Sequence, residues 1–285
     1  IGLVYYFFFS ALSVKSSTQY VYIDDDDNID SVYVKVKEIS TDRGYMAFTT
    51  LARHWDLAEK IRPGRYEVTT DNGAFTVFRK LKNGLQSPVN LTIPSVRTLD
   101  KLADEVSKKL MFSKDDFLKA VSDTATCRKY GYTPESIAAM FIPNTYSVYW
   151  NISVDKFLDK MQKENKKFWS FERENKAKAM GLSPIEVITM ASIVDEETAN
   201  DQEKPMIAGM YYNRLKGDMP LQADPTVKFA LKKFELKRIY HNMLSFDSPY
   251  NTYKYKGLPP GPIRIPSVAG IDAVLNYVHH DYLYM

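Results

Sequence analysis

The sequence predicts an α+β protein, and three observations support this fold class. Short runs rich in β-branched and aromatic residues, at 20–23, 65–69 and 89–93, are typical of strands. Between and after them lie longer stretches with helical periodicity and capping residues. The chain has 285 residues, 45% of them hydrophobic and 26% charged, which is enough material for two domains with separate cores.

Composition and charge exclude several function classes. The formal net charge is +3 and no long run of lysine or arginine occurs, so a nucleic-acid partner is not indicated. The single cysteine, Cys127, cannot form an internal disulfide and is interpreted as a small buried side chain. The four histidines lack a metal-ligand motif, and the aspartates at 24–27 lack the alternation and glycine of a calcium loop. We therefore expect no metal ion and no cofactor.

The first fourteen residues, IGLVYYFFFSALSV, are almost wholly apolar and carry no charge. This composition predicts the remnant of an N-terminal transmembrane anchor, truncated upstream because a spanning helix needs about 20 apolar residues. A cleaved signal peptide is one alternative, although no clear small-residue cleavage site follows. A buried helix or strand is the other.

The next part of the chain alternates strands and helices. After the strand at 20–23 and an acidic turn, Asp30 or Ser31 is expected to cap a helix that runs to about Ile39. A second helix is predicted over 46–61, with an interruption near His54, before the Pro-Gly break at 63–64 and the strand at 65–69. Residues 74–82 fit either a helix or a strand, with Gly84 as the stop, and 89–93 is a strand.

The middle of the chain is predicted to be mainly helical. Helices are expected over 98–110 and 113–121, and a short one after Pro134. A long, highly charged helical stretch covers 154–180, and Gly181 ends it.

The stretch at 182–198, LSPIEVITMASIVDEET, reads as a capped helix with a carboxylate on its apolar side. Ser183, Pro184 and Glu186 form the start signal of a capping box. At about 100° per residue, Glu197 lies on the same side as the apolar side chains, whereas its two acidic neighbours point elsewhere. Apolar surroundings raise the pKa of a carboxyl group and suit it to donate a proton, which makes Glu197 a candidate general acid. An ordinary solvated helix end is the alternative.

Several blocks, taken together in their order and spacing, carry a resemblance to a known family. They are ASIVDEET (191–198), YYNRL (211–215), MPLQADPTV (219–227), SPYNTYKYKGLPPGPI (248–263) and DYLYM (281–285). These blocks closely resemble the MltG/YceG-like endolytic murein transglycosylases, and a weaker likeness is traceable over about 60–170. One departure is Asn144, where the family usually has aspartate, so any electrostatic role of that position is in doubt.

The resemblance implies a domain organisation. After the anchor remnant at 1–14, it implies a LysM-like region over 15–95, which either binds glycan or serves as a spacer. A helical connecting part over 96–180 follows, and then a mixed α/β catalytic core over 181–285 that is truncated at its C-terminus. It also implies a single-pass protein of the bacterial plasma membrane, with the catalytic part on the periplasmic or cell-wall side.

The resemblance further implies an activity. Lytic transglycosylases cleave the β-1,4 bond between N-acetylmuramic acid and N-acetylglucosamine without water, leaving 1,6-anhydro ends, and Glu197 aligns with their catalytic acid. The same carboxyl group acts first as acid and then as base, whereas ordinary glycosidases usually need two carboxyl groups. A hydrolase in which Asp224 directs water is one alternative. A non-catalytic glycan-binding scaffold of the cell-wall synthesis machinery is the other, with peptidoglycan synthases and elongation or division proteins as possible partners.

Further substrate-binding residues are expected downstream of Glu197. Gln222 and Asp224 are candidates to position the sugar, although Asp224 also fits as the opening residue of a helix. Arg214 is expected to pair with Glu197 or Asp224, or to bind a substrate carboxylate. The remaining candidates are two aromatic side chains to stack on sugar faces or to pack internally, Tyr250 and Tyr253, and two polar ones for sugar hydroxyls, Asn251 and Thr252.

Overall fold

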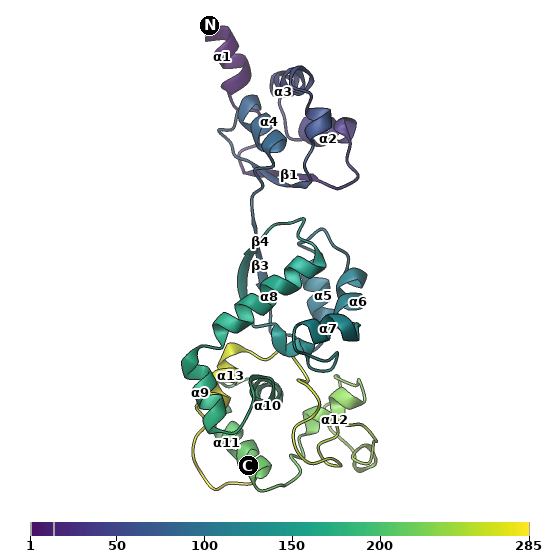
Figure 1. Cartoon of the computed structure of the whole chain (residues 1–285), viewed down its shortest axis with the longest axis vertical. Helices are drawn as coiled ribbons and strands as arrows, with labels where there is room; N and C mark the ends of the chain where they lie inside the picture. Colours follow the sequence, from purple (N-terminus) through teal and green to yellow (C-terminus); the bar gives the residue numbers. More distant parts are fainter. Residues whose placement is uncertain (1, 14, 285) are drawn as a thin grey trace. The chain divides into compact units, whose positions relative to one another are not determined.

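The computed structural model describes residues 2–13 and 15–284 and divides into two compact units (Figure 1). The N-terminal unit comprises 1–91, 109–112 and 146–152, and the C-terminal unit comprises 92–108, 113–145 and 153–285. The elements of the N-terminal unit are α1 (Gly2–Phe9), β1 (Gln19–Ile23), α2 (Ile29–Lys37), α3 (Asp42–His54), the 3-10 helix η1 (Leu57–Lys60), β2 (Gly64–Val68) and α4 (Ala74–Asn83). The division between the units falls within the strands β3 (Val89–Ile93) and β4 (Asn144–Val148), which form a second two-stranded sheet.

The N-terminal unit is built on an antiparallel pair of strands. β1 and β2 pair with Gln19 opposite Val68 and Ile23 opposite Gly64. Buried side chains alternate with more exposed ones along β2, so one face of the pair covers the core. The order strand, helix, helix, strand predicted for 20–69 is therefore confirmed, and residues 74–82, which fitted either state, belong to helix α4.

Two helix starts in this unit differ from the prediction. The cap of α2 is Asn28, not Asp30 or Ser31, because its side chain accepts the backbone N–H groups of both of these residues. α3 begins at Asp42, four residues before the predicted start, because Thr41 caps it. Its predicted interruption is confirmed, since α3 ends at His54 and η1 follows.

The apolar N-terminal segment packs partly on this unit. Phe7 and Phe8 of α1 lie against the hydrophobic core, and Leu12 is fully buried in it. The backbone of Leu12 also accepts a hydrogen bond from Thr41. Among the described residues, no single helix is long and apolar enough to cross a membrane; one pair, Phe171–Ala179 with Pro184–Glu197, passes that test only as two helices bent by 79°.

The C-terminal unit is predominantly helical. Its elements are α5 (Leu99–Ser107), α6 (Lys114–Ser122), α7 (Thr124–Lys129), η2 (Ile137–Met140), α8 (Val154–Phe168), α9 (Phe171–Ala179), α10 (Pro184–Glu197), α11 (Lys204–Lys216), α12 (Asp224–Ala230), η3 (His241–Met243) and α13 (Val268–Leu275). The charged stretch predicted as one helix over 154–180 is two helices. It breaks where Trp169 turns into the core and Ser170 caps α9.

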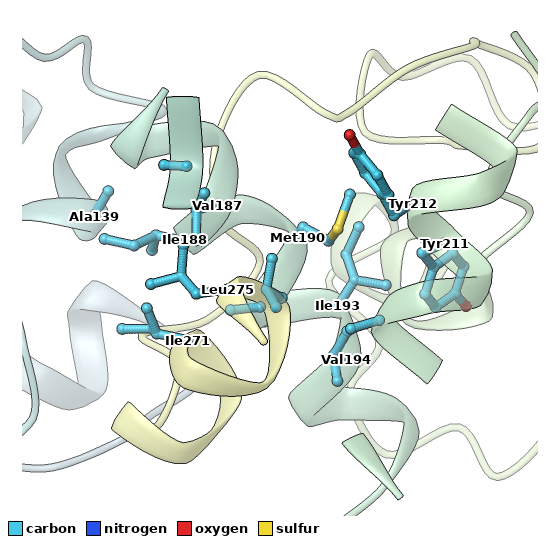
Figure 2. Packing of buried hydrophobic residues seen from close by; sticks show 14 of the residues in the cluster. Ala139, Val187, Ile188, Met190, Ile193, Val194, Tyr211, Tyr212, Ile271 and Leu275 are labelled. Carbon is cyan, nitrogen blue, oxygen red and sulfur yellow. The ribbon is translucent and has the colours of Figure 1, made fainter. Parts of the chain in front are cut away.

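Helix α10 forms the centre of the C-terminal unit. Its predicted capping box is confirmed, with Ser183 and Glu186 each bonding the backbone of the other. All residues from Val187 to Val194 are buried, so the helix is covered all round and not on one side only. Figure 2 shows how its side chains pack against α13, through Ile271 and Leu275, and against α11. This packing fixes the position of the acidic end of α10.

Candidate active site

The three consecutive carboxylates at the end of α10 have three different surroundings. Asp195 accepts hydrogen bonds from the backbone and hydroxyl of Ser267 and forms an ion pair with Lys204, 2.8 Å away. Glu196 lies between two guanidinium groups, those of Arg97 at 3.0 Å and Arg264 at 2.9 Å. Both carboxylates therefore hold the structure together, and of the three only Glu197 lines the cavity beyond the helix end.

Glu197 borders a cavity of about 370 Å³ within the C-terminal unit. Its walls come from α10, α11, the segment before α12 and two tyrosine-bearing loops, and the lining residues are Glu197, Thr198, Glu203, Ile207, Met210, Tyr211, Arg214, Gln222, Asp224, Tyr253 and Tyr284. The cavity thus brings together five of the eight predicted site residues. Its lining is rich in polar groups, as a site for a sugar requires.

The surroundings of Glu197 raise the pKa of its carboxyl group on balance. Burial by the cavity walls raises its pKa above the ordinary value, and the negative charge of Asp224 adds to this rise. A hydrogen bond from the Tyr211 hydroxyl to Glu197 Oε1, 2.6 Å long, and the positive charges of Lys228 and Arg214 lower the pKa and oppose it. The residue as a whole is exposed to solvent, which weakens these electrostatic effects on the pKa.

A second carboxylate faces the same cavity. Asp224 is the first residue of α12, where the helix dipole favours a negative charge, and it accepts a 2.6 Å hydrogen bond from the Tyr253 hydroxyl. Burial and this hydrogen bond raise the pKa of Tyr253, so its hydroxyl stays protonated and remains a donor. Asp224 therefore opens a helix, as one sequence interpretation had it, and also lines the cavity, whereas its predicted contact with a sugar stays a prediction.

Gln222 is held in an unusual backbone conformation. Its φ is +51°, the left-handed region that non-glycine residues rarely adopt. The segment is fixed on both sides, because Gln222 N–H donates to Thr252 O and Ala223 N–H donates to Thr252 Oγ1, each at 3.0 Å. The exposed side chain of Gln222 is thereby presented to the cavity.

The internal ion pair predicted for Arg214 does not fit the structure, whereas the alternative role, binding of a substrate carboxylate, stays a prediction. In the described part of the chain Arg214 makes no ion pair with Glu197 or Asp224; its guanidinium donates instead to the backbone carbonyls of Leu221, at 2.5 Å, and Leu283, at 2.6 Å. The buried guanidinium thus joins the segment before Gln222 to the C-terminal segment, which completes two walls of the cavity. Its charge still reaches Glu197 through space.

The other three predicted residues lie outside the cavity. Asn251 is fully buried, its amide donates to the carbonyls of Leu244 and Phe246, and its own oxygen accepts the N–H of Tyr253. Thr252 is buried beside Gln222, with its hydroxyl 2.8 Å from that of Thr226. Both side chains are thus directed into the protein interior, where they support the cavity wall. This arrangement does not fit the predicted contacts with sugar hydroxyls.

Tyr250 belongs to a different cavity. Its ring packs on Phe229 with 4.7 Å between the centroids, and it lines a largely apolar hollow of about 360 Å³ in the same unit. Burial raises its pKa to about 12. Asn144, the position that departs from the family pattern, lies in β4 and does not line the Glu197 cavity.

Two tyrosines that line the cavity, Tyr211 and Tyr284, were not predicted as site residues from the sequence. Tyr211 precedes Arg214 by three residues, so the two share a face of α11, and this spacing is the signal that would have identified it. Tyr284 stands over the guanidinium of Arg214 at 4.8 Å and was seen only as part of a motif. Within residues 2–13 and 15–284, no group of three or more His, Cys, Asp or Glu side chains is arranged to hold a metal ion.

Comparison with known proteins agrees on one family. The model of the YceG-like family matches residues 21–285. A protein of Streptococcus pneumoniae named endolytic murein transglycosylase is 28% identical over 292 residues, covering 92% of this chain and 53% of its own length, so the chain spans about half of that relative. A Bacillus subtilis protein of the same name is 45% identical over 103 residues, covering 36% of this chain and 28% of its own length. The crystal structure of a yceG-like protein from Listeria monocytogenes superposes with a TM-score of 0.61 at 27% identity, covering 95% of this chain and 93% of that one.

Proposed function

This chain belongs to the YceG-like family, and we propose from that premise that it is an endolytic murein transglycosylase acting on the glycan strands of peptidoglycan. The observation that carries the proposal is the placement of Glu197. Of three adjacent carboxylates it alone lines the polar cavity, and burial raises its pKa towards the range of a general acid.

The proposed reaction uses the Glu197 carboxyl group twice. Because Tyr211 donates to Oε1, we place the acidic proton on Oε2, from which it passes to the glycosidic oxygen as the bond to the muramyl C1 breaks. The 6-hydroxyl of the same muramyl residue then bonds to C1, and its proton returns to the Glu197 carboxylate. The products are a free 4-hydroxyl on N-acetylglucosamine and a 1,6-anhydro ring on N-acetylmuramic acid.

The other cavity residues have supporting roles in this proposal. Gln222 and Asp224 position the sugar next to Glu197, and the Asp224 charge stabilises positive charge that develops on the ring in the transition state. Tyr253 orients Asp224 through its hydrogen bond. Arg214 and Thr252 act as positioning residues, since both hold the segment that presents Gln222.

A hydrolase remains the second candidate, because Asp224 places another carboxylate in the same cavity. In that case Asp224 directs a water molecule to C1, and the new ends are reducing sugars. A glycan-binding scaffold without catalysis is the third possibility, and it predicts no new ends at all.

The products decide between these functions. We expect purified peptidoglycan with long, uncross-linked strands, incubated with the chain, to be cut internally and to yield 1,6-anhydromuramyl ends in mass spectra. Labelling with ¹⁸O water provides the control, since the lyase incorporates none and a hydrolase incorporates one atom for each cut. Reducing ends would establish the hydrolase, and retention on the strands without cleavage would establish the scaffold.

We predict that Tyr211→Phe moves the alkaline limb of the pH profile of kcat/KM to higher pH. The acid must be protonated, so activity falls as pH rises through the pKa of Glu197. The Tyr211 hydroxyl stabilises the carboxylate and lowers that pKa, so removing it raises the pKa further. The matched control is Tyr212→Phe, whose hydroxyl donates to Met180 O instead, and which we expect to leave the limb unmoved. A limb at lower pH in Tyr211→Phe would contradict this assignment.

The proposal also covers the parts of the chain that precede the catalytic unit. We assign the strand-helix-helix-strand unit as a LysM-like unit that binds glycan or serves as a spacer. We also assign membrane attachment to the apolar segment 1–14, with the catalytic unit on the cell-wall side. Peptidoglycan synthases are the partners that such a placement would favour. The support for these assignments is the composition of residues 1–14 and the order of elements that follows.

A further inference from the structure

The N-terminal unit exposes a group of large aromatic side chains from three elements. We call it the aromatic face and define it as Tyr5, Phe8 and Phe9 of α1, Trp55 directly after α3, and Phe75 of α4. The exposed fractions are 66% for Tyr5, 43% for Phe9 and 41% for Trp55. So much aromatic surface in contact with water is unfavourable for a protein that has no partner there.

Three rings of the aromatic face form a chain of contacts, and the other two line one hollow together with two of these. Tyr5 stacks on Phe9 with 5.0 Å between the centroids, and Phe9 lies 5.3 Å from Phe75. Between the helices lies an apolar hollow of about 290 Å³ whose lining includes Phe8, Phe9, Trp55 and Phe75. The face is therefore one continuous surface and not a set of scattered side chains.

Positive charges border the aromatic face. On α4, Arg79 and Lys82 follow Phe75 at helical spacing and lie on its side of the helix. The ammonium group of Lys82 is 5.9 Å from the centre of the Trp55 ring. The helix contains three basic residues and no acidic one, and the guanidinium of Arg43 on α3 lies over the ring of Tyr6 at 4.7 Å.

We propose that the aromatic face is a membrane-binding surface, which inserts its rings into the headgroup region of an anionic lipid bilayer. Tryptophan and tyrosine favour this region because their rings are apolar and their tips are polar, and the bordering cations match negative headgroups. The charge complementarity selects a lipid surface over a second copy of the chain, which would bring like charges together. The inference does not depend on the proposed catalytic function.

Three members of this face belong to the apolar segment 1–14, and the new element of the proposal is the part that the folded unit contributes. Trp55, Phe75 and Lys82 belong to the folded unit, and their contact with lipid would fix the orientation of this unit at the bilayer. The relevant experiment must therefore report on Trp55 and not only on whether the chain binds vesicles.

The first measurement is quenching of Trp55 fluorescence by brominated lipids. The chain is mixed with vesicles containing 30% phosphatidylglycerol in phosphatidylcholine, with bromine placed near the headgroup end of the acyl chains. The experiment is done with Trp150→Phe as the background, because Trp150 of the same unit is only half-buried. In this background we expect quenching that Trp55→Phe abolishes, because Trp169 is buried in the core of the other unit. Quenching that persists in Trp55→Phe, or vesicle-bound chain without quenching, would overturn the proposal.

The second measurement is vesicle affinity by flotation. We expect Trp55→Ser to weaken binding about tenfold through lost apolar contact, and Lys82→Gln to weaken it about fivefold on anionic vesicles only. The matched control is Val34→Ser on α2, an exposed apolar side chain outside the face, which should bind as the unchanged chain does. Circular dichroism must show that each variant is folded.

Two alternatives to lipid contact by the whole aromatic face predict different measurements. If the face joins two copies of the chain, sedimentation without lipid will detect a dimer that Trp55→Ser dissociates, and vesicles will not quench Trp55. If α1 alone holds the membrane, both variants will float as the unchanged chain does. Either result would overturn the proposal.

Discussion

Glu197→Gln is expected to lower the rate of glycan cleavage by about 10³- to 10⁴-fold, the largest effect of any single substitution. One carboxyl group is proposed to serve as acid and then as base, so its loss affects both steps, and general acid–base groups contribute about 10²- to 10⁴-fold each. The measurement is the initial rate of formation of anhydromuramyl ends, with glycan binding measured in parallel. Binding should survive, because glutamine keeps the size and hydrogen-bonding capacity of the side chain.

Glu197→Gln is predicted to lose activity without losing thermal stability. The pKa of Glu197 is raised in the folded protein, so above that pKa ionisation of the group works against folding. Glutamine removes this cost, and the melting temperature at neutral pH should therefore not fall. A loss of activity cannot then be ascribed to unfolding.

The neighbouring residue supplies the matched control. Glu196→Gln removes a carboxylate one residue away, but this carboxylate lies between Arg97 and Arg264 and not in the cavity. We expect it to lower the melting temperature and to leave kcat within about tenfold of the unchanged chain. If a folded Glu196→Gln were as inactive as Glu197→Gln, the assignment of the catalytic acid would be wrong.

Lys204→Met is expected to destabilise the C-terminal unit by about 3 kcal/mol. The ammonium group and the Asp195 carboxylate are buried, with 6% and 3% of their side chains exposed, and removing one partner leaves the other charge buried without its counterion. For a unit of this size the expected fall in melting temperature is about 6 to 12 °C. Thermal unfolding followed by circular dichroism measures it.

The reason for this effect lies in how Asp195 joins two helices. Besides Lys204, it binds Ser267, which caps α13, and it lies so close to Gly270 that an added Cβ would be 2.4 Å from its Oδ1. Burial alone would lower the pKa of Lys204, but its hydrogen bonds and the charges of Asp195 and Asp201 outweigh burial and raise the pKa. The lysine is thus charged at neutral pH, and its contribution is lost only as pH rises through the raised pKa, above about 10.5.

Two further variants test the buried pair. Lys108→Met removes the exposed ion pair with Glu105, 2.8 Å long, and should leave the melting temperature unchanged. The double variant Asp195→Leu with Lys204→Met should be less destabilised than the two single effects added together, since neither charge is then left unpaired. Additive effects would mean that the pair contributes no coupling energy.

Local sequence patterns determined much of the secondary structure. The capping box of Ser183 and Glu186 marks the start of α10 because it depends only on residues three apart, and the same holds for the glycine stop after α4. Helical periodicity predicted that Glu197 lies on the apolar side of α10 and that its two acidic neighbours do not, but α10 is buried on all sides and Glu197 is the most exposed of the three carboxylates. The family resemblance then connected this residue with a reaction that periodicity could not supply.

Only the tertiary structure decided which side chains face the cavity. Asn251 and Thr252 have the chemistry of sugar-binding residues, yet both are turned inward, because backbone groups of neighbouring loops require their hydrogen bonds. Arg214 binds carbonyls at 221 and 283, a pairing that no local pattern encodes. The burial of α10 on all sides is also a tertiary effect, since the hydroxyl of Ser192 can be buried only where it bonds Thr189 O and accepts the N–H of Ile263. A sequence fixes which groups are available, but long-range packing and the satisfaction of buried polar groups decide which of them remain free to bind a substrate.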